Sequence, residues 1–249
     1  MASLYLNGDL HESAFTVGAR LAVWGPEARH AKDVARVRQG QRIAIGDGAG
    51  RMAWGPVTFI GQGEVAITAE EIVVDARRTP RIQLVQALAK GDRDELAIQA
   101  ATELGVDAVV PWQARRSVSR WDGPKVAKGL ERWRSVVREA AKQAIRPTVP
   151  TVAEPVDSKQ LFDRIPELGL VLVLEPTGPE CLVDVPLDGV ELITLVVGPE
   201  GGIDGGELAQ LDAAGARIVR LGGEVLRTST AGPAALAALS VMTRRWSDS

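Results

Sequence analysis

The most informative part of the chain reads Leu195-Val-Val-Gly-Pro-Glu-Gly-Gly-Ile203, where an apolar run breaks into a glycine-rich turn. The β-branched and leucine side chains of residues 192–197 predict a buried strand. Because Gly198, Gly201 and Gly202 carry no Cβ, backbone amides there can approach a ligand closely. Glycines between a strand and a helix are also typical of a plain tight connection. The turn is therefore a candidate small-molecule site that needs support from the rest of the chain.

The familiar phosphate-binding loops do not occur in the sequence. No Gly-Lys-Ser or Gly-Lys-Thr follows a glycine loop, and no strand leads into Gly-x-Gly-x-x-Gly. The glycines of Gly46-Asp-Gly-Ala-Gly50 instead predict a hairpin turn. A nucleoside triphosphate or dinucleotide loop is thus a poor explanation of the candidate site.

Composition places the chain among ordinary globular proteins. Its 249 residues, 45% of them hydrophobic, suit one large domain or two smaller ones. The single cysteine, Cys181, excludes a disulfide framework, and two histidines leave little for a metal site, so we expect no metal and a reducing, cytoplasmic setting. No signal-peptide pattern and no apolar run of the roughly 18 residues that span a membrane are present. We expect a protein that is neither exported nor inserted into a membrane.

Charge is unevenly distributed along the chain, although the net charge is only −3. Residues 81–146 carry thirteen basic and eight acidic side chains, whereas residues 147–197 carry two basic and nine acidic ones. Phosphate contacts depend on the local potential within about a Debye length, so the basic middle section can bind a polyanion. Solvated helix faces are the alternative explanation of this cluster.

The first 75 residues predict a small β-barrel. Short strands separated by glycine-bearing turns are expected at residues 4–6, 42–45, 57–60 and 65–68. A short helix is expected at residues 26–37, where it would carry several cations. The charged, threonine- and proline-containing segment 75–80 is typical of a linker.

From residue 81 the pattern changes to strands that alternate with helices. Strands are expected at residues 82–88, 106–112, 170–174, 192–197 and 217–221, and helices at residues 93–104, 125–144, 204–215 and 233–245. This alternation predicts a mainly parallel sheet in an α/β domain.

Three of these helices carry distinct start or face signals. For the first, Asp92 with Glu95 predicts a capping box, and Leu96, Ala100 and Leu104 predict its buried face. Asp204 and Glu207 predict a capping box for the third helix. In the long helix, the spacing predicts a core-facing stripe of Val126, Leu130, Trp133, Val137 and Ala141. Basic residues, among them Lys142, surround this stripe.

Ligands of open α/β sheets lie beyond the carboxyl ends of the strands. This rule nominates the loops at residues 175–178, 198–203 and 222–230. Three loops from consecutive strands make a pocket, and one of them is the glycine turn.

Several motifs together resemble the RsmE-type methyltransferases of the SPOUT superfamily, which methylate N3 of a uridine in 16S rRNA of the small ribosomal subunit. The resemblance spans nearly the whole chain. The motifs that carry it are Gln86-Ala-Leu-Ala-Lys-Gly-Asp-Arg93, Ile98-Gln-Ala-Ala-Thr-Glu-Leu-Gly105, Arg116-Ser-Val118, Glu131-Arg-Trp133, Glu139-Ala-Ala-Lys-Gln143, Gly198-Pro-Glu-Gly-Gly202 and Leu226-Arg-Thr228.

The resemblance implies a PUA-like β-barrel that binds RNA at residues 1–75 and a SPOUT methyltransferase domain with a deep trefoil knot at residues 80–249. It also implies a homodimer that uses S-adenosylmethionine. The residues that it assigns to the cofactor are Leu174, Glu175, Pro176, Val197, Gly198, Pro199, Glu200, Gly201, Gly202, Leu221, Gly222, Leu226, Arg227, Thr228 and Thr230.

Methylation of uracil N3 requires loss of the N3 proton, by a general base or by cations that stabilise the anion. Arg227 is the candidate for the cation, and Glu200 is either a base or an anchor of its loop. Candidates for phosphate contacts are Arg36, Arg38, Lys90, Arg93 and Arg116.

The chain departs from the family pattern at Glu224, where arginine is usual, and at Ser229, where glutamate is usual. Two other functions therefore stay open. One is methylation of another RNA or of a ribose 2′-hydroxyl, and the other is a non-catalytic role in ribosome assembly.

Overall fold

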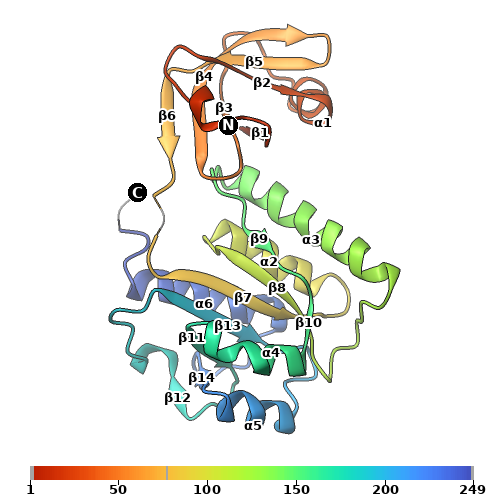
Figure 1. The fold of residues 1–249 in the computed structure, drawn as a ribbon, viewed down its shortest axis with the longest axis vertical. Helices are drawn as coiled ribbons and strands as arrows, with labels where there is room; N and C mark the ends of the chain where they lie inside the picture. The colour runs from red at the N-terminus through yellow and green to blue at the C-terminus, as the bar shows by residue number, and fades with distance from the viewer. Residues whose placement is uncertain (1–2, 77, 248–249) are drawn as a thin grey trace. The chain divides into compact units, whose positions relative to one another are not determined.

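The computed structural model describes residues 3–76 and 78–247 and has two units. Met1–Ala76 and Arg138–Val149 form the first unit, and Arg77–Val137 and Pro150–Ser249 form the second. Both helices and strands are present, so the protein is of the mixed α/β class that the sequence predicts (Figure 1). Residue 77 of the expected 75–80 linker lies outside the described residues.

The first unit is built on a six-stranded sheet. Its strands are β1 (Leu4–Leu6), β2 (Arg20–Trp24), β3 (Arg42–Gly46), β4 (Arg51–Gly61), β5 (Glu64–Thr68) and β6 (Glu71–Val74). Their order is β1-β3-β4-β5-β2, and β6 pairs with β4. The four predicted strands are confirmed, and β4 begins earlier than expected. Strands β2 and β6 were not predicted, because they alternate less clearly in polarity.

The turn between β3 and β4 is the predicted hairpin. The Asp47 carboxylate accepts hydrogen bonds from the amides of Ala49 and Arg51 at 2.6 and 3.0 Å. The helix expected at residues 26–37 is shorter, because α1 (Gly25–Arg29) passes into a π-helical turn at His30–Val34. Arg36 then adopts a positive φ of 50°, which ends the helical path.

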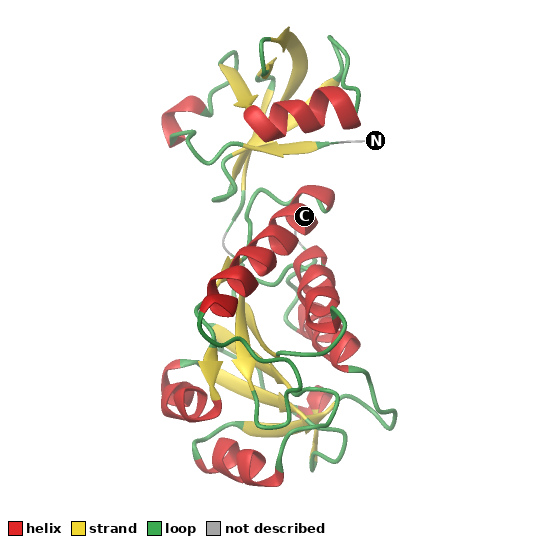
Figure 2. Ribbon diagram, turned by 90° about the vertical axis from the view of Figure 1, so that its right-hand side faces the viewer, coloured by secondary structure: helices red, strands yellow, loops and turns green. Residues whose placement is uncertain are grey.

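The second unit contains an eight-stranded sheet with helices on both faces (Figure 2). Its strands are β7 (Arg81–Ala87), β8 (Ala108–Gln113), β9 (Thr151–Val152), β10 (Val156–Asp157), β11 (Leu170–Leu174), β12 (Glu180–Cys181), β13 (Leu192–Val197) and β14 (Arg217–Arg220). The order is β10-β8-β7-β13-β11-β14-β12, with β9 beside β8. Every pairing between these strands is parallel, so the predicted parallel sheet is confirmed.

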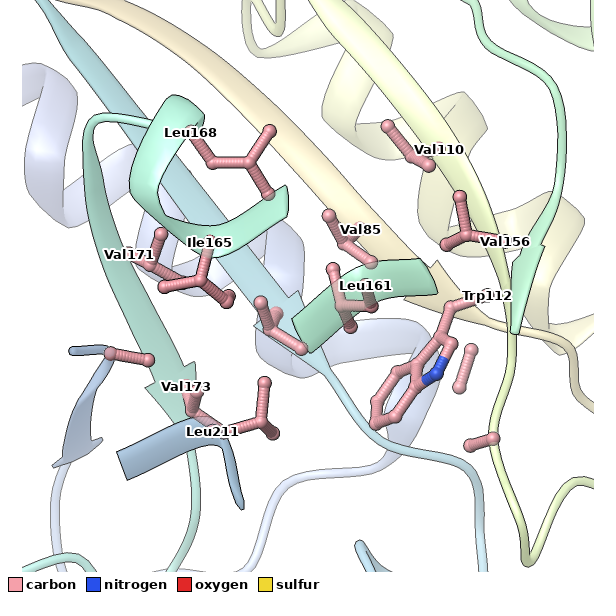
Figure 3. Packing of buried hydrophobic residues seen from close by; sticks show 14 of the residues in the cluster. Val85, Val110, Trp112, Val156, Leu161, Ile165, Leu168, Val171, Val173 and Leu211 are labelled. Atoms are coloured by element: carbon pink, nitrogen blue, oxygen red, sulfur yellow. The ribbon is translucent and has the colours of Figure 1, made fainter. Parts of the chain in front are cut away.

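The helices of this unit are α2 (Arg93–Glu103), α4 (Ser158–Arg164), α5 (Gly205–Ala213), α6 (Thr228–Met242) and the part of α3 (Pro124–Gln143) before Arg138, with short 3₁₀ turns at Ile165–Glu167 and Leu182–Asp184. The end of α3 belongs to the first unit. One core lies between the sheet and the helices α4 and α5. Figure 3 shows Leu161 and Ile165 beside the strand residues Val85 and Val171 in this cluster. Trp112 is fully buried at its edge. None of the helices in the described residues is long and apolar enough to cross a membrane.

The capping box predicted for α5 is confirmed. The Asp204 carboxylate accepts from backbone amides of the first turn, and the Glu207 carboxylate accepts from the Asp204 amide. The stripe predicted for α3 is also confirmed, since Leu130, Trp133, Val137 and Ala141 are buried. Lys142 differs from the expectation of a solvated residue. It is 5% exposed and lies 3.1 Å from both Glu27 and Glu139, which compensate its charge.

The prediction for α2 was wrong in two respects. Asp92 has a φ of 58° and makes no side-chain cap, so the Asp92–Glu95 capping box does not form. The predicted face is also wrong, because Leu96 is 54% exposed while Ala97, Ile98 and Ala101 are buried. The reason is that α2 packs closely on α6, and the small side chains permit that approach.

The start predicted for the last helix was wrong as well. Pro233 is typical of a first helical position, but α6 begins at Thr228 and runs through Pro233. The Thr228 hydroxyl is tied to Gln86 and to the carbonyl of Gly198, which fixes the helix start further upstream.

Candidate active site

Three loops meet at the carboxyl edge of the second unit's sheet and enclose a cavity of about 440 Å³. The strand register explains their meeting. Leu174 at the end of β11 pairs with Val197 at the end of β13 and with Val219 on the other side. The segments that follow these three strands therefore leave the sheet at the same edge. They are the loops that the strand rule nominates.

Most of the residues that the family resemblance assigns to the cofactor line this cavity, but Gly201 and Thr230 do not. Residues that the sequence analysis did not assign to the cofactor also contribute to the wall: Arg93, Ile203, Glu224, Val225 and Ala231. Glu224 and Val225 belong to the nominated loop 222–230, so the strand rule is the signal that points to them. Arg93 is the first residue of α2 and is distant in sequence from the three loops.

The glycine turn of the cavity is tightly constrained. A Cβ added to Gly198 would lie 2.5 Å from the Ile203 side chain, and Gly202 has a φ of +72°. The Gly202 amide donates to the Pro199 carbonyl at 2.9 Å and closes the turn. Glycine is therefore required at both positions for reasons of shape.

Glu200 projects from this turn and is held by the loop that follows β7. Its Oε1 accepts from the Lys90 amide at 3.0 Å and from the Arg93 guanidinium at 2.8 Å. Burial alone would raise the pKa of Glu200, but backbone amides and the Arg93 cation outweigh burial and lower it. An ionised carboxylate with these partners is suited to anchor a loop and poorly suited to take a proton.

The segment before α6 presents the second candidate catalytic side chain. Arg227 occupies the N-cap position of α6 with an extended backbone. In the described residues, its exposed guanidinium has no hydrogen-bond or ion-pair partner, and it lines the cavity. Next to it, Thr228 donates to the Gly198 carbonyl at 2.7 Å and accepts from Gln86 Nε2 at 2.9 Å. Thr228 thus joins Gln86 of β7 to the glycine turn.

The five candidates for phosphate contacts fall into two groups. Arg36 and Arg38 are in the first unit, where Arg36 is exposed and follows the π-helical turn. Lys90, Arg93 and Arg116 are in the second unit beside the glycine turn. Arg116 donates to the Gly201 carbonyl at 3.1 Å and lies 3.4 Å from Asp204. Among the described residues, no group of three or more histidine, cysteine, aspartate or glutamate side chains is arranged to hold a metal ion.

The comparisons with known proteins agree on one family. Residues 77–240 match the model of the RNA methyltransferase domain. The chain is 46% identical over 234 residues to "Ribosomal RNA small subunit methyltransferase E" of Mycobacterium bovis, an alignment that covers 92% of this chain and 89% of the relative.

Two solved structures are similar over nearly the whole chain. One is the ribosomal RNA small subunit methyltransferase E of Neisseria gonorrhoeae bound to S-adenosylmethionine, with a TM-score of 0.85, 28% identity and coverage of 97% and 98% of the two chains. The other is a methyltransferase of Legionella pneumophila in complex with the same cofactor, with a TM-score of 0.84, 26% identity and coverage of 97% and 98%. The chain therefore belongs to the ribosomal RNA small subunit methyltransferase E family.

Proposed function

We propose that the protein transfers the methyl group of S-adenosylmethionine to N3 of a specific uridine in 16S rRNA. Family membership and the cofactor-bound relatives support methylation of small-subunit rRNA. The observation that carries the proposal is the three-loop cavity, which is lined by the glycine turn and by Arg227, whose guanidinium has no partner among the described residues.

The cavity fits S-adenosylmethionine in size and in chemistry. Its volume of about 440 Å³ is within the range of small-molecule sites. Leu174, Val197 and Leu226 supply apolar walls for an adenine ring, and the constrained glycines expose backbone groups for its polar edge. Glu175 and Glu224 add negative charge that suits a cationic sulfonium.

In this mechanism the bound cofactor supplies an electrophilic methyl group. The protein has to hold the uracil N3 in line with that group and to favour loss of its proton. The Arg227 guanidinium would stabilise the negative charge that spreads over the uracil oxygens, while the proton passes to solvent. Glu200 stays ionised in its ion pair with Arg93 and holds the glycine turn in place.

The target uridine has to be unpaired or turned out of its helix, because its N3 lies on the Watson–Crick edge. Arg36, Arg38, Lys90, Arg93 and Arg116 are suited to contact the RNA backbone around it. The first unit would act as a PUA-like barrel at residues 1–75. The second would act as a SPOUT domain at residues 80–249 with a trefoil knot, in a cytoplasmic homodimer.

The test is transfer of labelled methyl groups to small ribosomal subunits from a strain that lacks this protein, followed by nucleoside mass spectrometry. We expect 3-methyluridine as the product. A 2′-O-methylated nucleoside would contradict N3 specificity. Absence of both transfer and cofactor binding would contradict the enzymatic function and favour a role in assembly.

A further inference from the structure

A second cavity lies in the same unit as the proposed active site, and the mechanism above does not use it. Its volume is about 340 Å³. The wall combines the loop after β7 with the segment that precedes α3 and with the facing side of that helix. Two tryptophans, Trp121 and Trp133, are part of it, together with Val118, whose side chain is 73% exposed.

Both walls of this second cavity are joined to the glycine turn. On one side, Lys90 and Arg93 hold Glu200, and Arg93 also lines the first cavity while its neighbours Asp92 and Asp94 line the second. On the other side, Arg116 donates to the Gly201 carbonyl, and the chain then runs through Val118 to Trp121. Residues of the segment 89–95 therefore line both cavities.

The indole of Trp121 packs directly against Gly129 of α3. A Cβ on Gly129 of α3 would lie 2.4 Å from the indole of Trp121, so no larger residue fits there. Glycine disfavours the interior of a helix, and its presence at this point is explained by the indole. Gln113 Oε1 accepts from the Trp121 amide at 2.9 Å, and the Trp133 ring packs edge-on at 5.5 Å. Trp121 is thus fixed in place but only partly buried.

The charges of the second cavity select what can enter it. Asp92, Asp94 and Glu95 contribute carboxylates, and Lys90 and Arg132 contribute cations. Arg132 forms an ion pair of 2.7 Å with Glu95. The carboxylates outnumber the cations by one, so the lining has a net negative charge that disfavours a phosphate but not an uncharged aromatic ring. The arginines that suit phosphates, Arg115 and Arg116, lie outside this cavity.

We propose that the second cavity receives an unpaired base of the RNA next to the methylated nucleotide, stacked on Trp121, and that it prefers a base with an exocyclic amino group. Stacking on an aromatic side chain is a general way to hold splayed RNA bases. The preference follows because the carboxylates accept hydrogen bonds and an amino group donates them. The inference rests on the proposed function, since it makes this cavity a specificity subsite of the same RNA substrate.

The test uses single-stranded RNA heptanucleotides with a central uridine and 2-aminopurine at one neighbouring position at a time. 2-Aminopurine carries an exocyclic amino group, and its fluorescence is quenched on stacking. We expect strong quenching by the full-length protein at one position beside the uridine. Trp121→Ala should weaken affinity for that RNA about tenfold, and Trp121→Phe should retain most of it.

Gly129→Ala tests the same point without removal of the indole. The added Cβ should displace Trp121 and reproduce the loss of RNA affinity. Affinity for S-adenosylmethionine, measured by calorimetry, should stay unchanged in all three variants. Val183→Ala, which truncates a 66% exposed valine outside both cavities, is the matched control and should have no effect.

The proposal is overturned if no neighbouring position is quenched or if Trp121→Ala binds the RNA as well as the wild type. A parallel loss of cofactor affinity would also overturn it, because Trp121 would then have a merely structural role. Equal affinity for RNA with uracil at the quenched position would overturn the amino-group preference. The fluorescence needs no methyl transfer, so quenching without methylation of subunits would contradict the proposed function and leave the subsite standing.

Discussion

The Arg93 guanidinium lies 2.8 Å from the carboxylate of Glu200, across a sequence separation of 107 residues. The Lys90 amide donates to the same carboxylate oxygen. This contact fastens the loop after β7 to the glycine turn after β13, so that the two loops keep one geometry around the cavity. It also gives Glu200 a role in which the carboxylate stays ionised.

We therefore predict that Glu200→Gln weakens the affinity for S-adenosylmethionine on the order of tenfold, because it removes a charged hydrogen-bond acceptor. The kcat at saturating cofactor should change little. Arg93→Gln should have a similar effect, and the double variant should be no worse than either single one, because both remove one interaction. Calorimetry and steady-state kinetics measure these quantities.

The pH dependence gives a separate check on Glu200. Its lowered pKa means that the stabilisation it contributes is present at neutral pH and is lost only as the pH falls through the folded-state value, below the ordinary value of about 4.3. Cofactor affinity should therefore be flat between pH 6 and 8. A general base at this position would instead show a kcat that falls by 10² or more in Glu200→Gln.

Thr228 is the second contact between distant segments that shapes the cavity. Thr228→Val keeps the size of the side chain but leaves the Gln86 amide and the Gly198 carbonyl without this partner. We expect a loss of about 1–3 kcal/mol in the free energy of unfolding, measured with urea, and weaker cofactor binding. Thr228→Ser retains the hydroxyl and should restore most of both. Unchanged stability in Thr228→Val would contradict this role.

Local signals in the sequence were sufficient for the strands that build the site. The apolar runs of β11 and β13 predict their bounds directly, and Asp204 with Glu207 predicts the start of α5. The order of these strands then nominates the loops, because ligands lie beyond the carboxyl ends of parallel strands. The position of the cavity thus follows from short-range patterns.

What the sequence could not provide depends on contacts between distant residues. Gln86 and Thr228 are separated by 142 positions, and no local pattern indicates that they share a hydrogen bond. The same contact fixes the start of α6, which Pro233 predicted wrongly. The buried face of α2 likewise depends on its neighbour α6, and spacing alone favoured Leu96.

Asp94 predicts a measurable effect of pH on stability. It is 6% exposed, and burial raises its pKa to about 6 despite hydrogen bonds from backbone amides. Between the unfolded-state value of about 3.9 and pH 6 the folded protein holds a proton that the unfolded chain has released. Stability therefore falls as the pH rises through this window, by on the order of 2–3 kcal/mol from this group.

The comparison with Asp94→Asn isolates that contribution. The variant cannot ionise, so its free energy of unfolding should rise relative to that of the wild type as the pH increases from 4 to 6.5. Urea unfolding at several pH values measures the difference. A difference that stays constant over this range would contradict the raised pKa, whatever the variant's absolute stability.

Arg227 provides the most direct test of the chemistry. Its guanidinium lines the cavity without a partner among the described side chains, so its removal should disturb the fold little. If it stabilises the charge that develops on the uracil oxygens, Arg227→Ala should lower kcat by about 10²–10³, with cofactor affinity unchanged. Arg227→Lys keeps the charge but not the planar donors, and it should recover part of the rate.

Since a uracil anion forms more readily at higher pH, the defect of Arg227→Ala should shrink as the pH rises from 7 to 9.5. A defect that is independent of pH, or full activity in Arg227→Ala, would remove this residue from the mechanism.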